Sequence, residues 1–182
     1  MAEKRWTPAS RDGAMRERAL IELGEKYGLQ PERLEDGIAL RGTLRGVELR
    51  VSQYAMPMGP DPRPRPFTEL WMAHGGQALG GLFGASPDAP GDTGDADFDL
   101  RFCWQSLPDP DGPAPGYLRS PEIRAGILAL DRDIASAVGH AGAQILQIDS
   151  LRGAVRMTIL THLPEALLLE RAIDLLSSIC AE

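Results

Sequence analysis

Hydrophobic and polar side chains alternate along two stretches of the chain that are separated by a short turn. Residues 38–44 and 47–53 each place apolar side chains at every second position, which is the pattern of a half-buried β-strand. The dipeptide 45–46, Arg-Gly, suits the two-residue turn of a β-hairpin. The resulting register sets Arg41 opposite Arg50, which is unfavourable unless both side chains splay into water or bind an anion. The same register pairs Leu40 with Val51 and Leu44 with Val47.

A second predicted hairpin lies near the end of the chain. Residues 143–149 and 154–161 alternate in the same way, and the dipeptide 152–153 between them is again Arg-Gly. Its register pairs Asp149 with Arg156, Ile148 with Met157, and Leu146 with Ile159. Both turns follow a leucine, which indicates either an ancient duplication or merely the suitability of Arg-Gly for a turn.

Two further strands are predicted between the hairpins. Residues 67–73 form one of them, and residues 98–105 show the cleanest alternation in the chain. In the second strand, one face carries Phe98, Leu100, Phe102 and Trp104, and the other carries Asp99, Arg101, Cys103 and Gln105. We expect the aromatic face to be core and the opposite face to meet solvent or a polar layer.

Three helices are predicted from apolar spacing and from capping residues. The first covers residues 11–27, with Ser10 as its N-cap and Gly28 as its left-handed end. The second begins at Ser120-Pro121-Glu122, an N-cap followed by a proline suited to the first helical position, and runs to about residue 130. The third covers residues 164–180.

The last helix carries more apolar residues than one narrow stripe requires. If the domain cannot cover this surplus, Leu169 and Ile173 would form a homodimer or partner surface. The alternative is an internal helix in a monomer.

Proline and glycine mark the loops. These are residues 56–66, 75–97 and 107–116, the second of them with a short strand near 79–83. Residues 1–9 are expected to be disordered, and residues 10–182 to form a single domain. Because hairpins dominate and no β-α-β alternation requires parallel strands, we predict an α+β fold. Its antiparallel sheet would combine two hairpins with two further strands, packed by an N-terminal, a middle and a long C-terminal helix.

Composition excludes several classes of function. The chain has 182 residues, which is the size of one domain, and a net charge of −7 from 19 basic and 26 acidic residues. That balance argues against binding to nucleic acid. Charged residues interrupt the longest apolar stretch, 163–176, so we expect no membrane span. The charged N-terminal stretch, 1–18, lacks the apolar core of a signal peptide, and two cysteines make no disulfide framework, which together predict a cytoplasmic protein.

Metal-ligating residues are scattered. The histidines, His74, His140 and His162, lie far apart, and no His or Cys spacing is typical of a zinc site. The weak candidate for calcium is the acidic run Asp92, Asp95, Asp97 and Asp99. A solvated acidic loop is the alternative, because the EF-hand pattern is absent. Asp131 and Asp133 form an Asp-x-Asp motif that would serve glycosyl transfer or metal binding, or would mark a solvated helix end. We expect no metal and no cofactor.

Five residues are the candidates for binding a ligand or a partner. They are Arg41, Arg50, Trp71, His74 and Cys103. His74 ends a predicted strand next to two glycines, and Cys103 lies on the polar side of its strand. A catalytic pair of a histidine with Cys103 has no supporting pattern, so a polar strand-end residue and a buried thiol are the structural alternatives.

Several short features resemble those of a diffuse set of uncharacterised bacterial soluble α+β proteins from GC-rich genomes. They are Tyr27-Gly28-Leu29 at a helix end, Leu40-x-Gly42-x-x-x-Gly46-Val47, Phe98-Asp99, Ser120-Pro121-Glu122-Ile123-Arg124 and the leucine-rich C-terminal helix. The low lysine and high arginine, alanine and glycine content fits such a genome. The resemblance implies the same α+β layout and brings no activity or site residue with it.

Two classes of function remain. The first is a non-catalytic interaction or structural protein, which binds a protein partner or a second copy through Leu169, Ile173 or the proline-rich loop. The second is a small-ligand-binding module or an enzyme with a pocket between sheet and helices. A deep pocket lined by Trp71, Arg41 or Arg50 would favour the second class, and a wide exposed apolar patch the first.

Overall fold

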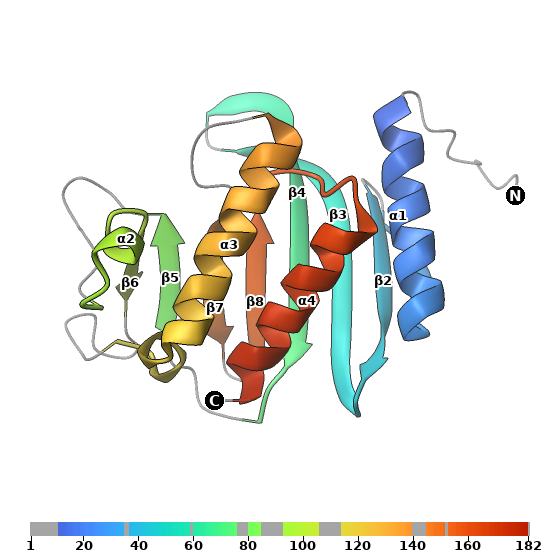
Figure 1. Ribbon diagram of the computed structural model, residues 1–182. Coiled ribbons are helices and arrows are strands. Elements are labelled where there is room, and N and C mark those ends of the chain that lie inside the picture. The colour runs from blue at the N-terminus through green and yellow to red at the C-terminus, as the bar shows by residue number, and fades with distance from the viewer. Residues whose placement is uncertain are drawn as a thin grey trace, which may run out of the picture.

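An antiparallel sheet forms one layer of the molecule, and the three long helices lie together on one side of it (Figure 1). The computed structural model describes residues 11–34, 37–58, 60–75, 80–84, 93–105, 114–139, 145–151 and 153–181. Within them the sheet has eight strands in the order β1-β2-β3-β4-β8-β7-β5-β6. The predicted α+β class and antiparallel sheet are confirmed.

The elements follow one another as α1, four strands, β5, α2, β6, a short 3-10 helix η1, α3, β7, β8 and α4. The strands are β1 (Gln30–Leu34), β2 (Gly37–Leu44), β3 (Val47–Met58), β4 (Asp61–Ala73), β5 (Gly80–Gly84), β6 (Phe102–Gln105), β7 (Ile145–Leu151) and β8 (Ala154–Ile159). The helices are α1 (Arg11–Tyr27), α2 (Ala96–Asp99), η1 (Gly116–Arg119), α3 (Pro121–Val138) and α4 (Ala166–Ala181). Among the described residues, no helix is long and apolar enough to cross a membrane.

The first hairpin has the predicted register. Arg41 pairs with Arg50, and the other two predicted pairs are also present. Arg45 and Gly46 have φ values of 52° and 83°, so both central residues of the turn are left-handed. That is the backbone of a type I′ turn, whose twist matches the strands that it joins.

The first helix also has its predicted bounds, and Gly28 ends it with a φ of 67°. Leu29 then turns back, and its backbone N–H donates to the carbonyl of Gly24 at 2.9 Å. A Cβ on Gly42 of β2 would lie 2.8 Å from the Leu29 side chain, so glycine permits this close approach. The chain continues into β1, an edge strand that the sequence did not predict. Pro31 is compatible with it because an edge strand has one unpaired side.

The prediction of a loop over residues 56–66 is wrong. β3 and β4 extend through this segment as a hairpin arm that pairs only with itself beyond Tyr54 and Phe67. Prolines fix φ near the extended region, and a two-stranded arm leaves one side of each strand free of hydrogen bonds. The prolines of the arm are therefore compatible with β-structure, and Pro57 pairs with Pro64.

The strand predicted over residues 98–105 is partly wrong. Residues 96–99 form the short helix α2, and the strand β6 begins only at Phe102. Phe98 and Phe102 are buried, their rings 5.2 Å apart, but Leu100 is 80% exposed. Two aromatic residues four positions apart fit a helical turn as well as a strand, and Asp95 caps that turn by accepting from the Phe98 backbone N–H.

The later elements follow the prediction with two adjustments. A bulge between Ile145 and Gln147 pairs Ile145, instead of Leu146, with Ile159. The second helix is longer than predicted and ends at Val138. Its predicted cap is confirmed, because the Ser120 hydroxyl accepts from the Ile123 backbone N–H.

The predicted loops other than 56–66 are only partly described. β5 lies close to the short strand predicted near 79–83, and η1 occupies the end of the predicted loop 107–116. Residues 1–9, most of 75–97 and residues 107–113 lie outside the described residues.

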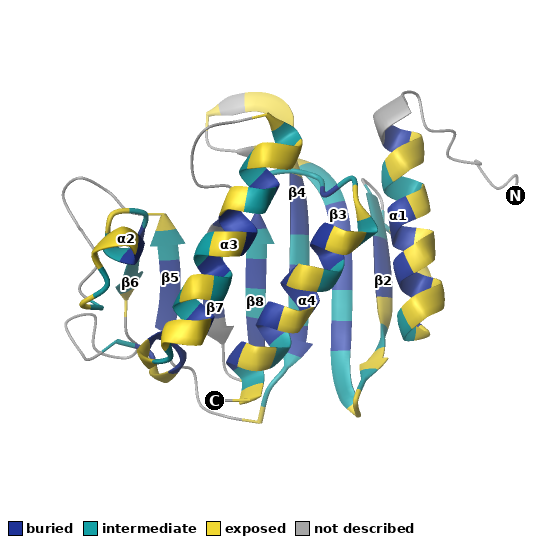
Figure 2. Ribbon diagram, viewed as in Figure 1, coloured by how far each residue is buried: buried dark blue, intermediate teal, exposed yellow. Residues whose placement is uncertain are grey.

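The core lies between the helices and the face of the sheet that they cover. Buried and half-buried positions alternate over residues 68–73 of β4 and 155–159 of β8, and Figure 2 shows these classes in dark blue and teal. The buried row across the strands consists of Leu40, Val51, Leu70, Met157, Ile148 and Leu82. On α4, Leu169 and Ile173 are fully buried within this chain, as the alternative of an internal helix requires. These two residues offer no surface to a partner.

Candidate functional site

The face of the sheet opposite the helices carries a row of arginines around a tryptophan. Because strand side chains alternate, the residues next to the buried row point to this second face, which we call the free face. One row of paired positions crosses β2, β3, β4, β8 and β7. It consists of Arg41, Arg50, Trp71, Arg156 and Asp149.

The first and last arginines of this row, Arg41 and Arg156, are paired with carboxylates. Arg41 donates to Glu48 at 2.6 and 2.9 Å, and this hydrogen bond raises the pKa of the Arg41 guanidinium. Arg156 donates to Asp149 at 2.6 and 3.1 Å and lies 3.9 Å from Glu69. The hydrogen bond to Asp149 is the main reason that the pKa of Arg156 is raised. Glu48, Asp149 and Glu69 are therefore engaged with arginines within the chain.

Arg50 lies between these two clusters and differs from both of its arginine neighbours. The residue is half-buried, and within the described part of the chain it forms no ion pair. Three buried side-chain polar atoms of the described residues lack a hydrogen-bond partner, and Arg50 Nε is the one that belongs to a charged group. Burying part of a cation without a counter-charge costs free energy. Arg50 Nε is thus a buried donor that finds no acceptor among the described residues.

Aromatic side chains share the free face with the arginines. Trp71 is half-buried and pairs with Arg50 on one side and Arg156 on the other. The rings of Tyr54 and Phe67 are stacked with centroids 5.8 Å apart. The Tyr54 hydroxyl donates to Glu69 at 3.4 Å, and burial together with that carboxylate raises the pKa of Tyr54. The free face therefore combines apolar contact area with charge.

Glycine shapes the far end of the same face. A Cβ on Gly81 of β5 would lie 2.9 Å from the Phe83 ring and 3.2 Å from Asp149. Phe83 is therefore able to lie along its own strand only because position 81 has no side chain. The free face has aromatic groups on both the β3–β4 side and the β5 side.

The structure brings together three of the five residues predicted from the sequence. Arg41, Arg50 and Trp71 are consecutive in the row. His74 follows β4, where its backbone N–H donates to the Gly153 carbonyl at 2.9 Å. Cys103 lies on the same face but on β6, with three strands between it and β4, and its thiol donates to the Gly84 carbonyl at 3.6 Å. Neither His74 nor Cys103 contributes to the row.

Sequence reasoning missed the residues that complete the row. The register of the second hairpin placed Asp149 opposite Arg156, so the ion pair itself was predictable. What could not be predicted is that β8 lies beside β4, which sets Arg156 next to Trp71. This contact joins segments far apart in the chain, and no local pattern encodes it.

The acidic candidates have structural partners. Asp95 caps α2 and lies 3.3 Å from Arg124, and Asp99 accepts from both the backbone and the hydroxyl of Thr93. Asp97 is exposed, and Asp92 lies outside the described residues. Among the described residues, no three His, Cys, Asp or Glu side chains come together as metal ligands would.

The Asp-x-Asp motif is no solvated helix end, because α3 continues beyond it. Asp131 is fully buried; it accepts from Arg101 at 2.6 Å and from the Ile145 backbone N–H at 3.0 Å. Asp133 forms a more exposed ion pair with Arg171. Asp131 therefore anchors the entry of β7 and the chain before β6 to α3.

His162 occupies a position that the sequence did not single out. It follows β8, its Nε2 donates to the Tyr54 carbonyl at 2.9 Å, and Arg16 of α1 contacts its ring. Thr68 holds the same segment by donating to Thr161 and accepting from Leu163. Burial, opposed by the hydrogen bond to Tyr54 and aided by the Arg16 charge, lowers the pKa of His162 to about 4. His162 is therefore neutral at physiological pH.

A pocket of about 390 Å³ lies on the outer surface between α3 and α4. Its lining does not include Trp71, Arg41 or Arg50. Comparison of the chain with protein-family models, with curated proteins and with solved structures finds no match.

Proposed function

We propose that this protein is a non-catalytic interaction protein that binds an acidic segment of a partner protein on the free face of its sheet. The observation that carries the proposal is the buried Nε of Arg50, which has no hydrogen-bond partner, while the neighbouring Arg41 and Arg156 pair with Glu48 and Asp149. An incoming Asp or Glu carboxylate would supply the missing counter-charge. Charge-assisted hydrogen bonds of that kind are stronger than neutral ones.

Trp71 supports a protein segment over a free inorganic anion. Trp71 is half-buried, pairs with an arginine on each neighbouring strand and so offers apolar contact area beside Arg50. Tryptophan and arginine are the residue types that contribute most to binding at protein interfaces. A segment with an apolar side chain next to an acidic one would satisfy both groups.

The alternative of a small-ligand site or an enzyme has less support. Neither the arginines of the row nor Trp71 line the pocket between α3 and α4. Burial raises the pKa of the Cys180 thiol to about 11, which leaves that thiol a poor nucleophile. In this proposal the protein is cytoplasmic, since Cys103 and Cys180 are unpaired, as in a reducing compartment. It does not bind nucleic acid, since the net charge is −7.

A displayed library of random peptides tests the proposal, with the wild-type protein as bait. We expect the enriched peptides to combine Asp or Glu with an adjacent aromatic or aliphatic residue. Their affinity should fall about tenfold or more in Arg50→Gln and in Trp71→Ala. Arg45→Gln removes the same charge from an exposed turn residue and should leave the affinity unchanged. Enrichment of basic peptides, or equal affinity in Arg50→Gln and Arg45→Gln, would rule out this site.

A further inference from the structure

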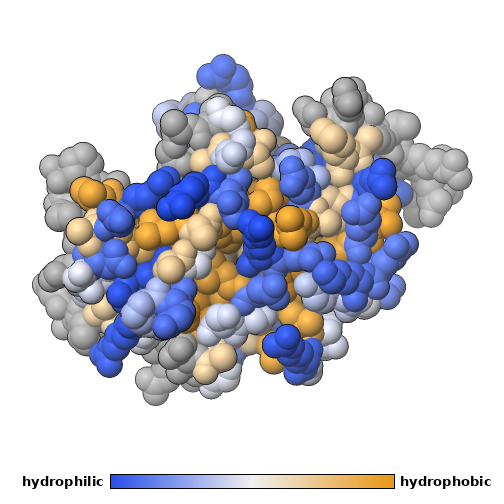
Figure 3. All heavy atoms as spheres, in the orientation of Figure 1, coloured by the Kyte–Doolittle hydropathy of each residue, from blue (hydrophilic) through white to orange (hydrophobic). Residues whose placement is uncertain are grey.

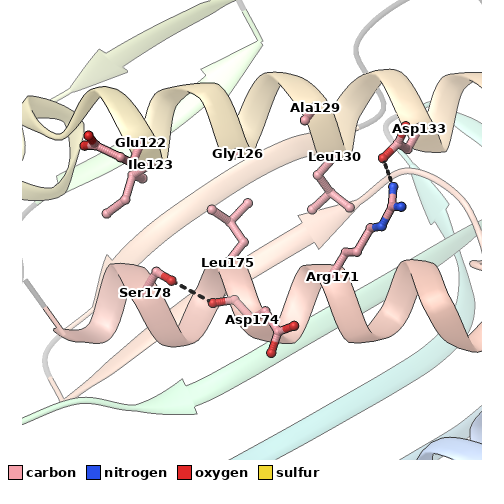
Figure 4. Close-up of a pocket in the computed structure, with 10 residues that line it drawn as sticks. All are labelled: Glu122, Ile123, Gly126, Ala129, Leu130, Asp133, Arg171, Asp174, Leu175 and Ser178. Carbon is pink, nitrogen blue, oxygen red and sulfur yellow. Dashed lines mark hydrogen bonds and ion pairs between the residues drawn. The ribbon is translucent and has the colours of Figure 1, made fainter.

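The outer surface between α3 and α4 holds a second feature, which is separate from the free face. Figure 3 shows hydrophobic atoms exposed in a trough along these helices, with hydrophilic atoms on both sides. The floor of the trough is formed by Ile123, Gly126, Leu130 and Leu175 (Figure 4). We call this trough the outer groove.

A glycine and a salt bridge determine the shape of the outer groove. A Cβ on Gly126 would lie 3.1 Å from Leu175, so glycine keeps the middle of the floor open and lets the helices approach. The ion pair between Asp133 and Arg171 bridges the two helices at one end (Figure 4). From Glu122 to Asp133, α3 rises about 16 Å, which is about three turns of a docked helix.

The charge on the rim of the groove is acidic. Arg171 is engaged with Asp133, whereas Glu122 and Asp174 are exposed on opposite sides of the floor. Hydrogen bonds from its own backbone N–H and from Ser120 lower the pKa of Glu122, so this carboxylate stays ionised. An apolar floor between two carboxylates is complementary to an apolar stripe flanked by a basic residue.

We propose that the outer groove docks an amphipathic helix of a partner protein, with its apolar stripe on Ile123, Leu130 and Leu175 and a lysine or arginine facing Glu122 and Asp174. The occupant is basic, in contrast to the acidic segment proposed for the free face. The two sites lie on opposite sides of the sheet, so one protein could join two partners of opposite charge.

Two synthetic helical peptides of ~15 residues test this groove. One is built from leucine and lysine, and the other has the same leucine stripe with glutamate in place of lysine. Fluorescence anisotropy should show binding of the lysine peptide to the wild-type protein and little binding of the glutamate peptide. Because exposed ion pairs are individually weak, the double variant Glu122→Gln, Asp174→Asn should reduce the affinity about fivefold.

A matched control separates the groove from the general acidity of the protein. Glu25→Gln, Asp97→Asn removes two exposed carboxylates elsewhere and should change the affinity far less than the groove double variant. Ala129→Trp fills the groove and should abolish binding, whereas Ala125→Trp, on an exposed position of α3 outside the lining, should not. Unfolding curves for all variants would verify that each one folds. Equal losses in both double variants, undiminished binding to Ala129→Trp, or no binding to wild type would overturn the inference.

Discussion

The two faces of one sheet are built from alternate residues of the same strands, yet they differ in chemistry. The covered face presents aliphatic side chains that are almost completely buried under α1, α3 and α4. The free face presents arginines, carboxylates and aromatic rings, among them Arg50, Trp71 and Arg156 at intermediate exposure. Alternation along a strand explains why the faces can differ. Alternation does not explain why Arg50 Nε is buried on the free face without a hydrogen-bond partner. This difference favours a role of Arg50 in binding a partner over a role in stabilising the fold.

The largest effect should come from a substitution on the covered face of β4. Leu70 is fully buried, so Leu70→Ala removes buried apolar area and leaves a cavity. We expect it to lower the free energy of unfolding by about 3–4 kcal/mol. Its neighbour Glu69 lies on the free face, and Glu69→Ala should cost less than about 1 kcal/mol. Chemical denaturation of both variants measures the contrast, and equal losses would contradict the assignment of the two faces.

Asp131 shows that a charge buried on the covered side of the sheet needs hydrogen-bond donors around it. Its carboxylate is fully buried and accepts from Arg101 and from the Ile145 backbone. Asp131→Ala would leave both donors without their acceptor, and we expect a loss of about 3 kcal/mol. Asp133→Ala breaks a more exposed pair with Arg171 and should cost below about 1 kcal/mol. Chemical denaturation measures both variants. If their free energies of unfolding fall by the same amount, the buried Asp131 stabilises the fold no more than the exposed Asp133 does.

Local patterns predicted the parts of the fold in which neighbours in the chain are also neighbours in space. The type I′ turn at Arg45-Gly46, the first hairpin and the Ser120 cap are such parts. The α2 turn was missed because the spacing of Phe98 and Phe102 fits both a helix and a strand. The arm was missed because prolines were taken to exclude pairing, although a two-stranded ribbon tolerates them.

The candidate site was predictable only in part, for the same reason. Arg41 and Arg50 belong to one hairpin, so their juxtaposition follows from its register. Trp71 joins them through the next strand pair, and Arg156 only through the pairing of β4 with β8. That last contact joins Trp71 to Arg156, 85 positions later in the chain. Whether the Arg50 guanidinium finds a carboxylate within the chain depends on β2, β3, β4 and β8 together.

His162 links the edge of the free face to α1, through Tyr54 and Arg16. Its titration predicts how the stability of the protein depends on pH. Its pKa is lowered from 6.5 to about 4, so between these values the unfolded chain binds more protons than the folded one. The stabilisation from neutral His162 is therefore present above pH 6.5 and is lost as the pH falls toward 4. His162→Gln should flatten the dependence of the melting temperature on pH in this range. An unchanged slope would show that His162 is not held neutral.

The most direct test of the free-face account is the free energy of unfolding of Arg50→Met. If Arg50 serves a partner, the isolated protein loses nothing when its partly desolvated cation is replaced by an apolar side chain of similar length. The account predicts a variant at least as stable as wild type, with a gain of up to about 1 kcal/mol. A loss of more than about 1 kcal/mol would show that Arg50 stabilises the fold itself, and it would contradict the account.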